Sequence, residues 1–200
     1  MKKRDFTLVE LLAVTALIVI LAGLGFAAFS YASNRGKEAA TKSLITRISA
    51  GLESVKIKHG TFPAGASSYG NIEVVEDYTG IISEVKFNGS ALNSKQLKTF
   101  LTVCDGESLK KNLTLDNDDA SGKKRTYHIT DAWGGAVKYR CPGLINTIKF
   151  DLVAPGADGG FGNGSTPATT PPATAPSGKT VLDNYKTDGE WACDDIANFN

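Results

Sequence analysis

Hydrophobic residues fill the first part of the chain almost without interruption. Residues 11–29 contain no charged side chain and no proline. A helix rises about 1.5 Å per residue, so this stretch is about as long as the hydrocarbon core of a bilayer is thick. The pattern predicts a membrane-spanning helix over residues 6–29. Lys2, Lys3 and Arg4 precede it, and such basic residues stay on the cytoplasmic side of a membrane.

From residue 30 onwards the hydrophobic positions lie on one side of a helix. They recur at helical spacing: Leu44, Ile45, Ile48, Leu52 and Val55. Residues 30–58 contain no proline, whereas Gly60 and Pro63 follow them closely. We therefore predict one continuous helix over residues 6–58. Its second half presents an apolar face to a folded domain formed by residues 59–200.

The remaining chain shows short apolar segments separated by turns. Residues 71–75 and 81–87 are either strands or parts of a broken helix, and residues 94–103 predict a short helix. Apolar and polar residues alternate, as they do in half-buried strands, in three further segments: 125–130, 136–141 and 147–154. Gly134-Gly135 predicts a hairpin-type turn between the first two of these strands.

These elements predict an α+β fold, in which a long N-terminal helix packs against a small antiparallel sheet. Residues 164–180 are rich in threonine, proline, alanine and glycine. Such a segment buries too little apolar surface to order itself, so we expect a flexible insertion there.

Net charge and cysteine content narrow the possible functions. The chain has 22 basic and 21 acidic side chains. It therefore lacks the excess of positive charge that would favour nucleic acid as a partner. The three cysteines lack the C-x-x-C spacing of zinc or thioredoxin-type sites. In an oxidising compartment one disulfide can form among Cys104, Cys141 and Cys193. Three pairings are open, and Cys141 with Cys193 is favoured because both flank the same C-terminal loop. The alternative is three reduced thiols.

Glu10 is the unusual residue of the apolar segment. A charged side chain near the end of a spanning helix costs a few kcal/mol unless it finds a partner. A cleaved secretory signal has the same basic start and is the simplest alternative, with a possible cleavage site near Ala27-Ala28. Such a signal gains nothing from Glu10, whereas a carboxylate neutralised by another chain in an assembly explains its presence.

The N-terminal residues KKRDFTLVELLAVTALIVILA resemble the start of type IV prepilins and type II secretion pseudopilins. Phe6 to Glu10 match the F-T-L-x-E that opens the mature chains of these families. The segments DAWGGAVKYRCPG and FDLVAPGADG are similar to a conserved block of the major pseudopilin. HGTFPA after the helix and the closing DDIANFN also resemble that family, whereas residues 65–125 and the insertion do not.

The resemblance implies a structural subunit rather than an enzyme. A prepilin peptidase would remove residues 1–5, cutting between Asp5 and Phe6, and the new amine would be methylated. The helix would stay in the bacterial inner membrane, with its N-terminus cytoplasmic and the domain periplasmic, until a filament forms with other pseudopilins on the secretion platform. Glu10 would pair with the amine of Phe6 on a neighbouring copy. Asp5 departs from the family, which usually has glycine there.

Glycine-rich loops with aspartates form a candidate calcium site. Carboxylate and carbonyl oxygens on flexible loops suit calcium, which takes about 6–8 oxygen ligands. The resemblance implies that Pro155 gives a carbonyl and that Asp158, Asp194 and Asp195 give carboxylates. The alternative is that these aspartates are simply solvated.

Other motifs carry weaker signals. Residues 159–164 are glycine-rich but do not lead into a helix, as a nucleotide-binding loop would. Residues 115–122 are acidic and predict a polar turn.

From the resemblance and the apolar N-terminal segment together, we expect a pseudopilin that drives protein export. The alternatives are a type IV pilin for adhesion or DNA uptake, or a membrane-anchored binding module.

Overall fold

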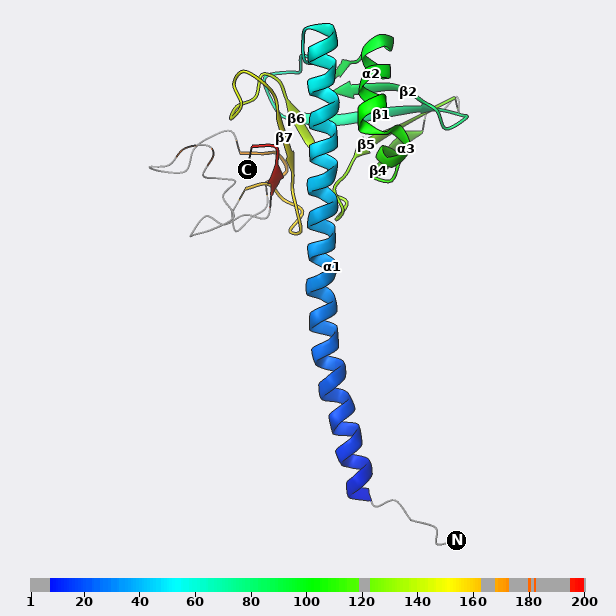
Figure 1. Ribbon diagram of the computed structural model, residues 1–200, viewed down its shortest axis with the longest axis vertical. Helices are drawn as coiled ribbons and strands as arrows, with labels where there is room; N and C mark the ends of the chain where they lie inside the picture. The colour runs from blue at the N-terminus through cyan, green and yellow to red at the C-terminus, as the bar shows by residue number, and fades with distance from the viewer. Residues whose placement is uncertain are drawn as a thin grey trace. The chain divides into compact units, whose positions relative to one another are not determined.

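The computed structural model describes residues 8–118, 123–162, 168–172, 180, 182 and 195–199. The chain divides into two compact units, Met1–Lys37 and Glu38–Asn200. Helix α1 (Leu8–His59) begins in the first unit and ends in the second (Figure 1).

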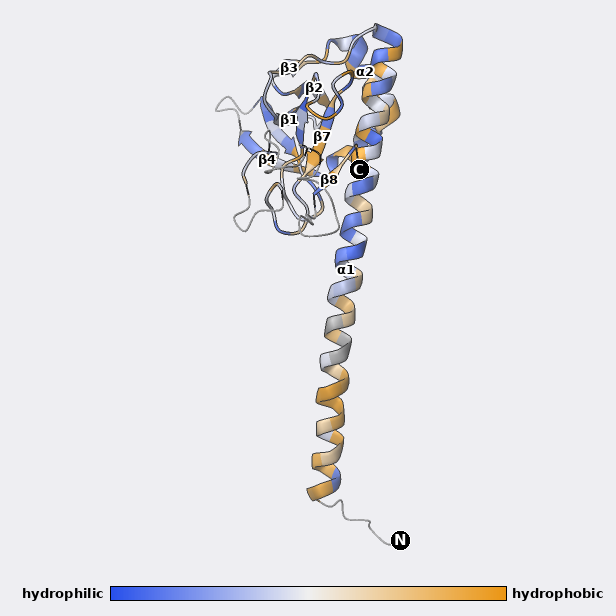
Figure 2. Ribbon diagram, turned by 90° about the vertical axis from the view of Figure 1, so that its left-hand side faces the viewer, coloured by the Kyte–Doolittle hydropathy of each residue, from blue (hydrophilic) through white to orange (hydrophobic). Residues whose placement is uncertain are grey.

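Helix α1 confirms the predicted continuous helix and the position where it ends. It stops at His59, and Gly60 follows with a φ of 89°. This left-handed conformation suits glycine at the C-terminus of a helix. The predicted start at Phe6 lies outside the described residues. Figure 2 shows that hydrophobic residues dominate the first part of α1, before polar residues become frequent.

A sheet with antiparallel pairing lies in the second unit. Among the described residues it has eight strands: β1 (Gly70–Asp77), β2 (Ile82–Phe87), β3 (Ser90–Ala91), β4 (Leu113–Asp118), β5 (Lys124–Ile129), β6 (Lys138–Arg140), β7 (Asp151–Ala154) and β8 (Ile196–Ala197). The main path runs β3-β2-β1-β6-β7-β8, and β5 pairs with both β1 and β4. The sheet and the long helix confirm the predicted α+β fold.

Strand β1 joins the two halves of the sheet. It pairs with β2 and β5 along most of its length. It pairs with β6 only through Gly70 with Tyr139 and Asn71 with Lys138. The connection between the β1-side strands and β6-β7-β8 is therefore short.

The structure resolves the segments that the sequence left open. Residues 71–75 and 81–87 lie in β1 and β2 rather than in a broken helix. Helix α2 (Ser94–Cys104) confirms the predicted short helix, and α3 (Gly106–Lys110) follows it. The predicted polar turn at residues 115–122 is wrong for residues 115–118, which belong to β4. An edge strand tolerates charged residues because one of its sides faces solvent.

The predicted hairpin between residues 125–130 and 136–141 is only partly formed. Gly134 has a φ of 95°, and a bridge joins Thr130 to Ala136. Beyond that bridge the strands separate, because β5 and β6 each pair with β1. The predicted strand over residues 147–154 is shorter than expected, since only Asp151–Ala154 are extended.

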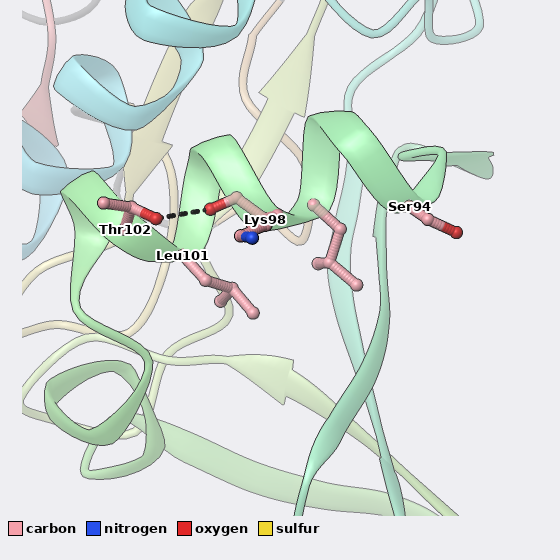
Figure 3. Close-up of a pocket in the computed structure, with 5 residues that line it drawn as sticks. Ser94, Lys98, Leu101 and Thr102 are labelled. Atoms are coloured by element: carbon pink, nitrogen blue, oxygen red, sulfur yellow. Dashed lines mark hydrogen bonds between the residues drawn. The ribbon is translucent and has the colours of Figure 1, made fainter.

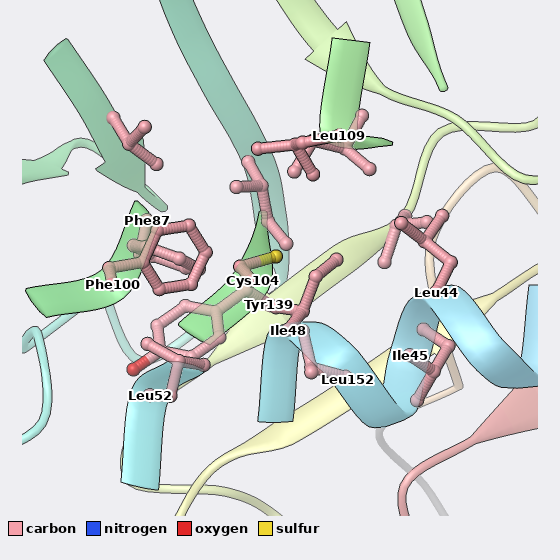
Figure 4. Close-up of a cluster of buried hydrophobic side chains, with 14 of the residues drawn as sticks. Leu44, Ile45, Ile48, Leu52, Phe87, Phe100, Cys104, Leu109, Tyr139 and Leu152 are labelled. Atoms are coloured by element: carbon pink, nitrogen blue, oxygen red, sulfur yellow. The ribbon is translucent and has the colours of Figure 1, made fainter. Parts of the chain in front are cut away.

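The core lies where the second half of α1 meets the sheet and α2. The predicted apolar face of α1 is confirmed, because Leu44, Ile48, Leu52 and Val55 are fully buried. These side chains belong to one buried cluster with an aromatic group from the sheet and α2, and Figure 4 shows Leu52 beside that group. In that group the ring of Phe87 lies edge-on to Phe100 and to Tyr139, with centroids 5.4 and 5.0 Å apart.

Part of the predicted flexible insertion at residues 164–180 belongs to the fold. Ala168 forms a bridge with Phe161 and packs beside a small buried cluster of Tyr69, Val153 and Phe161. Pro171 is buried. Residues 164–167 and 173–179 lie outside the described residues, so the prediction of flexibility is not tested there.

Candidate functional site

The first unit presents an apolar helix surface. Its described side chains are exposed, including Leu8 at 75%, Ile18 at 58% and Phe26 at 75%. Among the described residues, α1 is the one helix long and apolar enough to cross a membrane. Because a large exposed apolar surface is unfavourable in water, lipid or another protein must cover it.

Glu10 is the acidic residue in the first turn of α1. A carboxylate is favoured there by the partial positive charge at a helix N-terminus. Its neighbours Val9 and Leu11 are 73% and 61% exposed, so the charge lies within the apolar surface. Asp5 and Phe6, the residues of the predicted cleavage, lie outside the described residues.

Two of the predicted calcium ligands hold the same glycine-rich loop. Asp158 is exposed, and its Oδ1 accepts a hydrogen bond from Gly160 N at 2.8 Å. Asp195 is 2% exposed, and its Oδ2 accepts a hydrogen bond from Gly162 N at 2.6 Å. The structure therefore brings these carboxylates to residues 160–162. Asp194, another predicted ligand, lies outside the described residues.

Pro155, the predicted carbonyl ligand, is buried. Its ring lies so close to Gly135 that a side chain at that position would collide with it. Within the described part of the chain, no three acidic, histidine or cysteine side chains form a metal-binding group. The described oxygens alone therefore supply only part of a calcium site, because calcium takes about 6–8 ligands.

Asp131, whose role the sequence analysis missed, connects two turns. It is 4% exposed, and its Oδ1 accepts hydrogen bonds from Trp133 N at 2.9 Å and Gly135 N at 2.8 Å. Its Oδ2 accepts one from Gly156 N at 3.1 Å. Burial raises the pKa of Asp131 above its usual value, while these backbone hydrogen bonds act in the opposite direction. The signal in the sequence was an aspartate followed closely by two glycines.

Asp151, also missed, organises the loop before β7. It is fully buried. Its Oδ2 accepts hydrogen bonds from the Tyr69 hydroxyl at 3.0 Å, Leu144 N at 2.6 Å and Ile145 N at 2.8 Å. A Cβ on Gly143 would lie 2.5 Å from Oδ1, so only glycine fits there. The signal was a carboxylate within the otherwise apolar run FDLVA.

The cysteines and histidines have separate surroundings. Cys104 and Cys141 are free thiols, and Cys193, the predicted partner of Cys141, lies outside the described residues. Burial raises the pKa of the Cys104 thiol to about 11, which keeps it protonated at neutral pH. His59 Nε2 lies 3.1 Å from the Thr99 hydroxyl, and His128 Nδ1 lies 3.7 Å from Asp116 Oδ2.

A shallow depression lies on the outer side of α2 (Figure 3). It has a volume of about 420 Å³ and is lined by Ser94, Leu97, Lys98, Leu101 and Thr102. The Thr102 hydroxyl donates a hydrogen bond to the Lys98 carbonyl at 2.7 Å, so it is satisfied within the helix. The lining combines two leucines with three polar side chains, of which Lys98 is the charged one.

Comparisons with protein-family models, with curated proteins and with solved structures find no match to this chain. The function is therefore inferred from the residues of this chain and their geometry.

Proposed function

We propose that this chain is a structural subunit of a type II secretion pseudopilus, a periplasmic filament that drives protein export. The observation that carries the proposal is Glu10 in the first turn of an exposed apolar helix. A helix that served only as an anchor would gain from this carboxylate no more than the small stabilisation of a negative charge at a helix N-terminus. In a helix that moves from lipid into an assembly, the carboxylate can determine which neighbouring helix packs against it.

The pairing of Glu10 with the amine of Phe6 on a neighbouring copy is the proposed assembly contact. Both groups would be costly alone in an apolar bundle, whereas together they neutralise each other. A shifted register would leave both charges unpaired. This difference would specify one register for the packed helices.

Localisation follows from the same segment. Lys2, Lys3 and Arg4 would hold the N-terminus in the cytoplasm of the bacterial cell. The unit Glu38–Asn200 would then face the periplasm. The partners would be further copies of this chain, other pseudopilins, the inner-membrane platform and the prepilin peptidase.

The block that resembles the major pseudopilin supports secretion rather than adhesion. Its residues are the ones that fasten the loops: Asp131 joins its own turn to Gly156, and Asp151 holds residues 144–146. We extend the proposal to a calcium ion held by the carboxylates of Asp158, Asp194 and Asp195 with the Pro155 carbonyl. Its support is that Asp158 and Asp195 converge on one glycine-rich loop.

The test replaces Glu10 in the full chain. We would express the protein in a bacterium that lacks its own major pseudopilin but keeps the other secretion components. Glu10→Ala should remain in the membrane but form no filaments and support no export. Glu38→Ala is the matched control, because Glu38 pairs with the exposed Lys42 one turn further along the same helix and such pairs contribute little.

Normal filaments from Glu10→Ala would reject the proposed assembly contact. Mass spectrometry of the membrane form should find a chain that starts at N-methylated Phe6, and an intact leader would contradict the proposed cleavage. Filaments that support adhesion or DNA uptake but no export would favour a type IV pilin instead.

A further inference from the structure

Lys138 and Asn71 face each other at the short connection between β1 and β6. They are register partners across the two strands. Lys138 Nζ donates a hydrogen bond to Asn71 Oδ1 at 2.6 Å, and the contact is partly buried. Nζ therefore lies next to the carbon of a side-chain amide.

The surroundings of Lys138 differ from those of an ordinary surface lysine. Most surface lysines extend into solvent or approach a carboxylate. The Lys138 side chain bonds to Asn71. Among the described residues, no carboxylate pairs with it. Burial lowers the pKa of Lys138. This shift increases the fraction of neutral amine, which is the nucleophilic form.

We propose that Lys138 and Asn71 form an isopeptide bond that joins β1 to β6. The neutral Nζ attacks Cγ of Asn71, the new Nζ–Cγ bond forms, and the Cγ–Nδ2 bond breaks. Nδ2 leaves as ammonia after taking the proton that Nζ gives up. Both sides of the reaction are at the same oxidation level, so no oxidant or metal takes part.

We assign the transfer of that proton to Glu73, an acidic residue on the same face of β1 as Asn71. It lies two residues after Asn71 on β1, so both side chains project from the same face of the strand. Its side chain is 34% exposed and lies 3.7 Å from Lys86 Nζ, while His128 is its register partner on β5. The carboxylate would accept the proton from Nζ and return it to Nδ2.

The position gives the bond a mechanical consequence. β1 and β6 share only two register pairs, so little backbone pairing holds the halves of the sheet together at this point. A covalent bond between residues 67 apart in sequence closes a long loop and restricts the unfolded chain. The inference does not depend on the proposed function, although a filament subunit under load would benefit from such a bond.

Mass spectrometry of the purified full chain tests the proposal. The wild-type protein should be lighter, by the mass of one ammonia, than the mass calculated for the N-terminus that the purified chain carries. Tandem analysis of a digest should find a branched peptide that joins the Asn71 and Lys138 fragments. A wild-type protein with its full mass, after long incubation at mildly alkaline pH, would overturn the proposal.

Two variants distinguish the ammonia lost when the isopeptide bond forms from ammonia lost in other reactions. Asn88-Gly89 can also lose ammonia by cyclisation of the asparagine, which requires no lysine. Lys138→Arg keeps a donor for Asn71 but should abolish the branched peptide and its loss of ammonia. Lys149→Arg, which changes an exposed lysine paired with Glu53, should keep both. If Lys138→Arg loses as much ammonia as the wild type, the proposal is wrong.

Glu73→Gln tests the proton carrier. This variant keeps the shape of the side chain but cannot accept the proton, so the bond should form at least tenfold more slowly over an incubation series. An unchanged rate would remove Glu73 from the mechanism. The branched peptide itself would decide whether the bond forms.

Discussion

Asp131 and Asp151 are buried carboxylates that are satisfied mainly by backbone amides rather than by basic side chains. Hydrogen bonds from amides to a carboxylate are stronger than those between neutral groups. Each aspartate fixes the path of a loop that has little regular structure of its own. These carboxylates are therefore local organisers of the β6-β7-β8 half of the sheet.

Asp131 should make stability depend on pH. Its pKa in the folded state is raised from 3.8, chiefly by burial, so the folded protein binds a proton more tightly than the unfolded chain does. The free energy of unfolding that Asp131 contributes should fall as pH rises from about 3.8 through the higher folded-state pKa. Urea titrations of the wild type and of Asp131→Asn at several pH values measure this.

The Asp131→Asn variant should also be less stable at every pH. The new side-chain amide turns an N–H group towards one of the backbone donors, which costs about 1–3 kcal/mol. Asp77→Asn is the control, because the contribution of Asp77 to stability changes with pH in the opposite direction. The Thr79 hydroxyl and the Ile81 amide hold the pKa of the half-buried Asp77 below 3.8, so its contribution is lost as pH falls. A pH-independent difference between wild type and Asp131→Asn would contradict the prediction.

At the scale of elements, α1 and α2 pack closely because Gly51 has no side chain. A Cβ there would lie 2.7 Å from the ring of Phe100, which is fully buried. By local helix propensity alone, glycine at this position would be less favourable than alanine. The structure shows that the position is required for contact with the second helix.

Helix α2 begins with a capping box. Asn93 Oδ1 accepts hydrogen bonds from Lys95 N at 3.1 Å and Gln96 N at 3.0 Å. The Gln96 side chain accepts one from Asn93 N at 3.0 Å. These contacts satisfy backbone donors that a helix leaves unpaired at its start.

Asn93→Ala should destabilise the domain by about 1 kcal/mol, because the cap is lost while the backbone donors remain. Chemical denaturation of the unit Glu38–Asn200 measures the change. Asn93→Asp retains the acceptor and should be close to the wild type. Equal stability of the alanine and aspartate variants would show that the cap contributes nothing.

At the scale of the whole molecule, the two units differ in how their apolar side chains are kept from water. The unit Glu38–Asn200 contains its own core, whereas the apolar side chains of Met1–Lys37 that the structure describes are exposed. A fragment that begins at Glu38 should therefore fold without a membrane. It provides a soluble sample for questions about the C-terminal loops.

Calcium should stabilise that fragment if the proposed site forms. We expect its melting temperature to rise by several degrees with calcium and to fall with a chelator, since a ligand that binds only the folded state stabilises it. Asp158→Asn should reduce the rise, whereas Asp77→Asn, in a distant turn, should not. An unchanged melting temperature would mean that Asp158 and Asp195 only hold residues 160–162.

The sequence by itself determined the features that depend on neighbouring residues. The continuity of α1, its end before Gly60 and its buried face of Leu44, Ile48 and Leu52 follow from local periodicity and backbone preference. The resemblance to pseudopilins rests on the same kind of local pattern, and it stays a prediction.

Only the tertiary structure decided the features that depend on distant residues. Asp131 meets Gly156, Asn71 meets Lys138, and the charged segment over residues 113–118 becomes a strand because β5 lies beside it. Alternation and turn residues show that a strand is possible. They do not specify its partner, because register is fixed by contacts across the sheet.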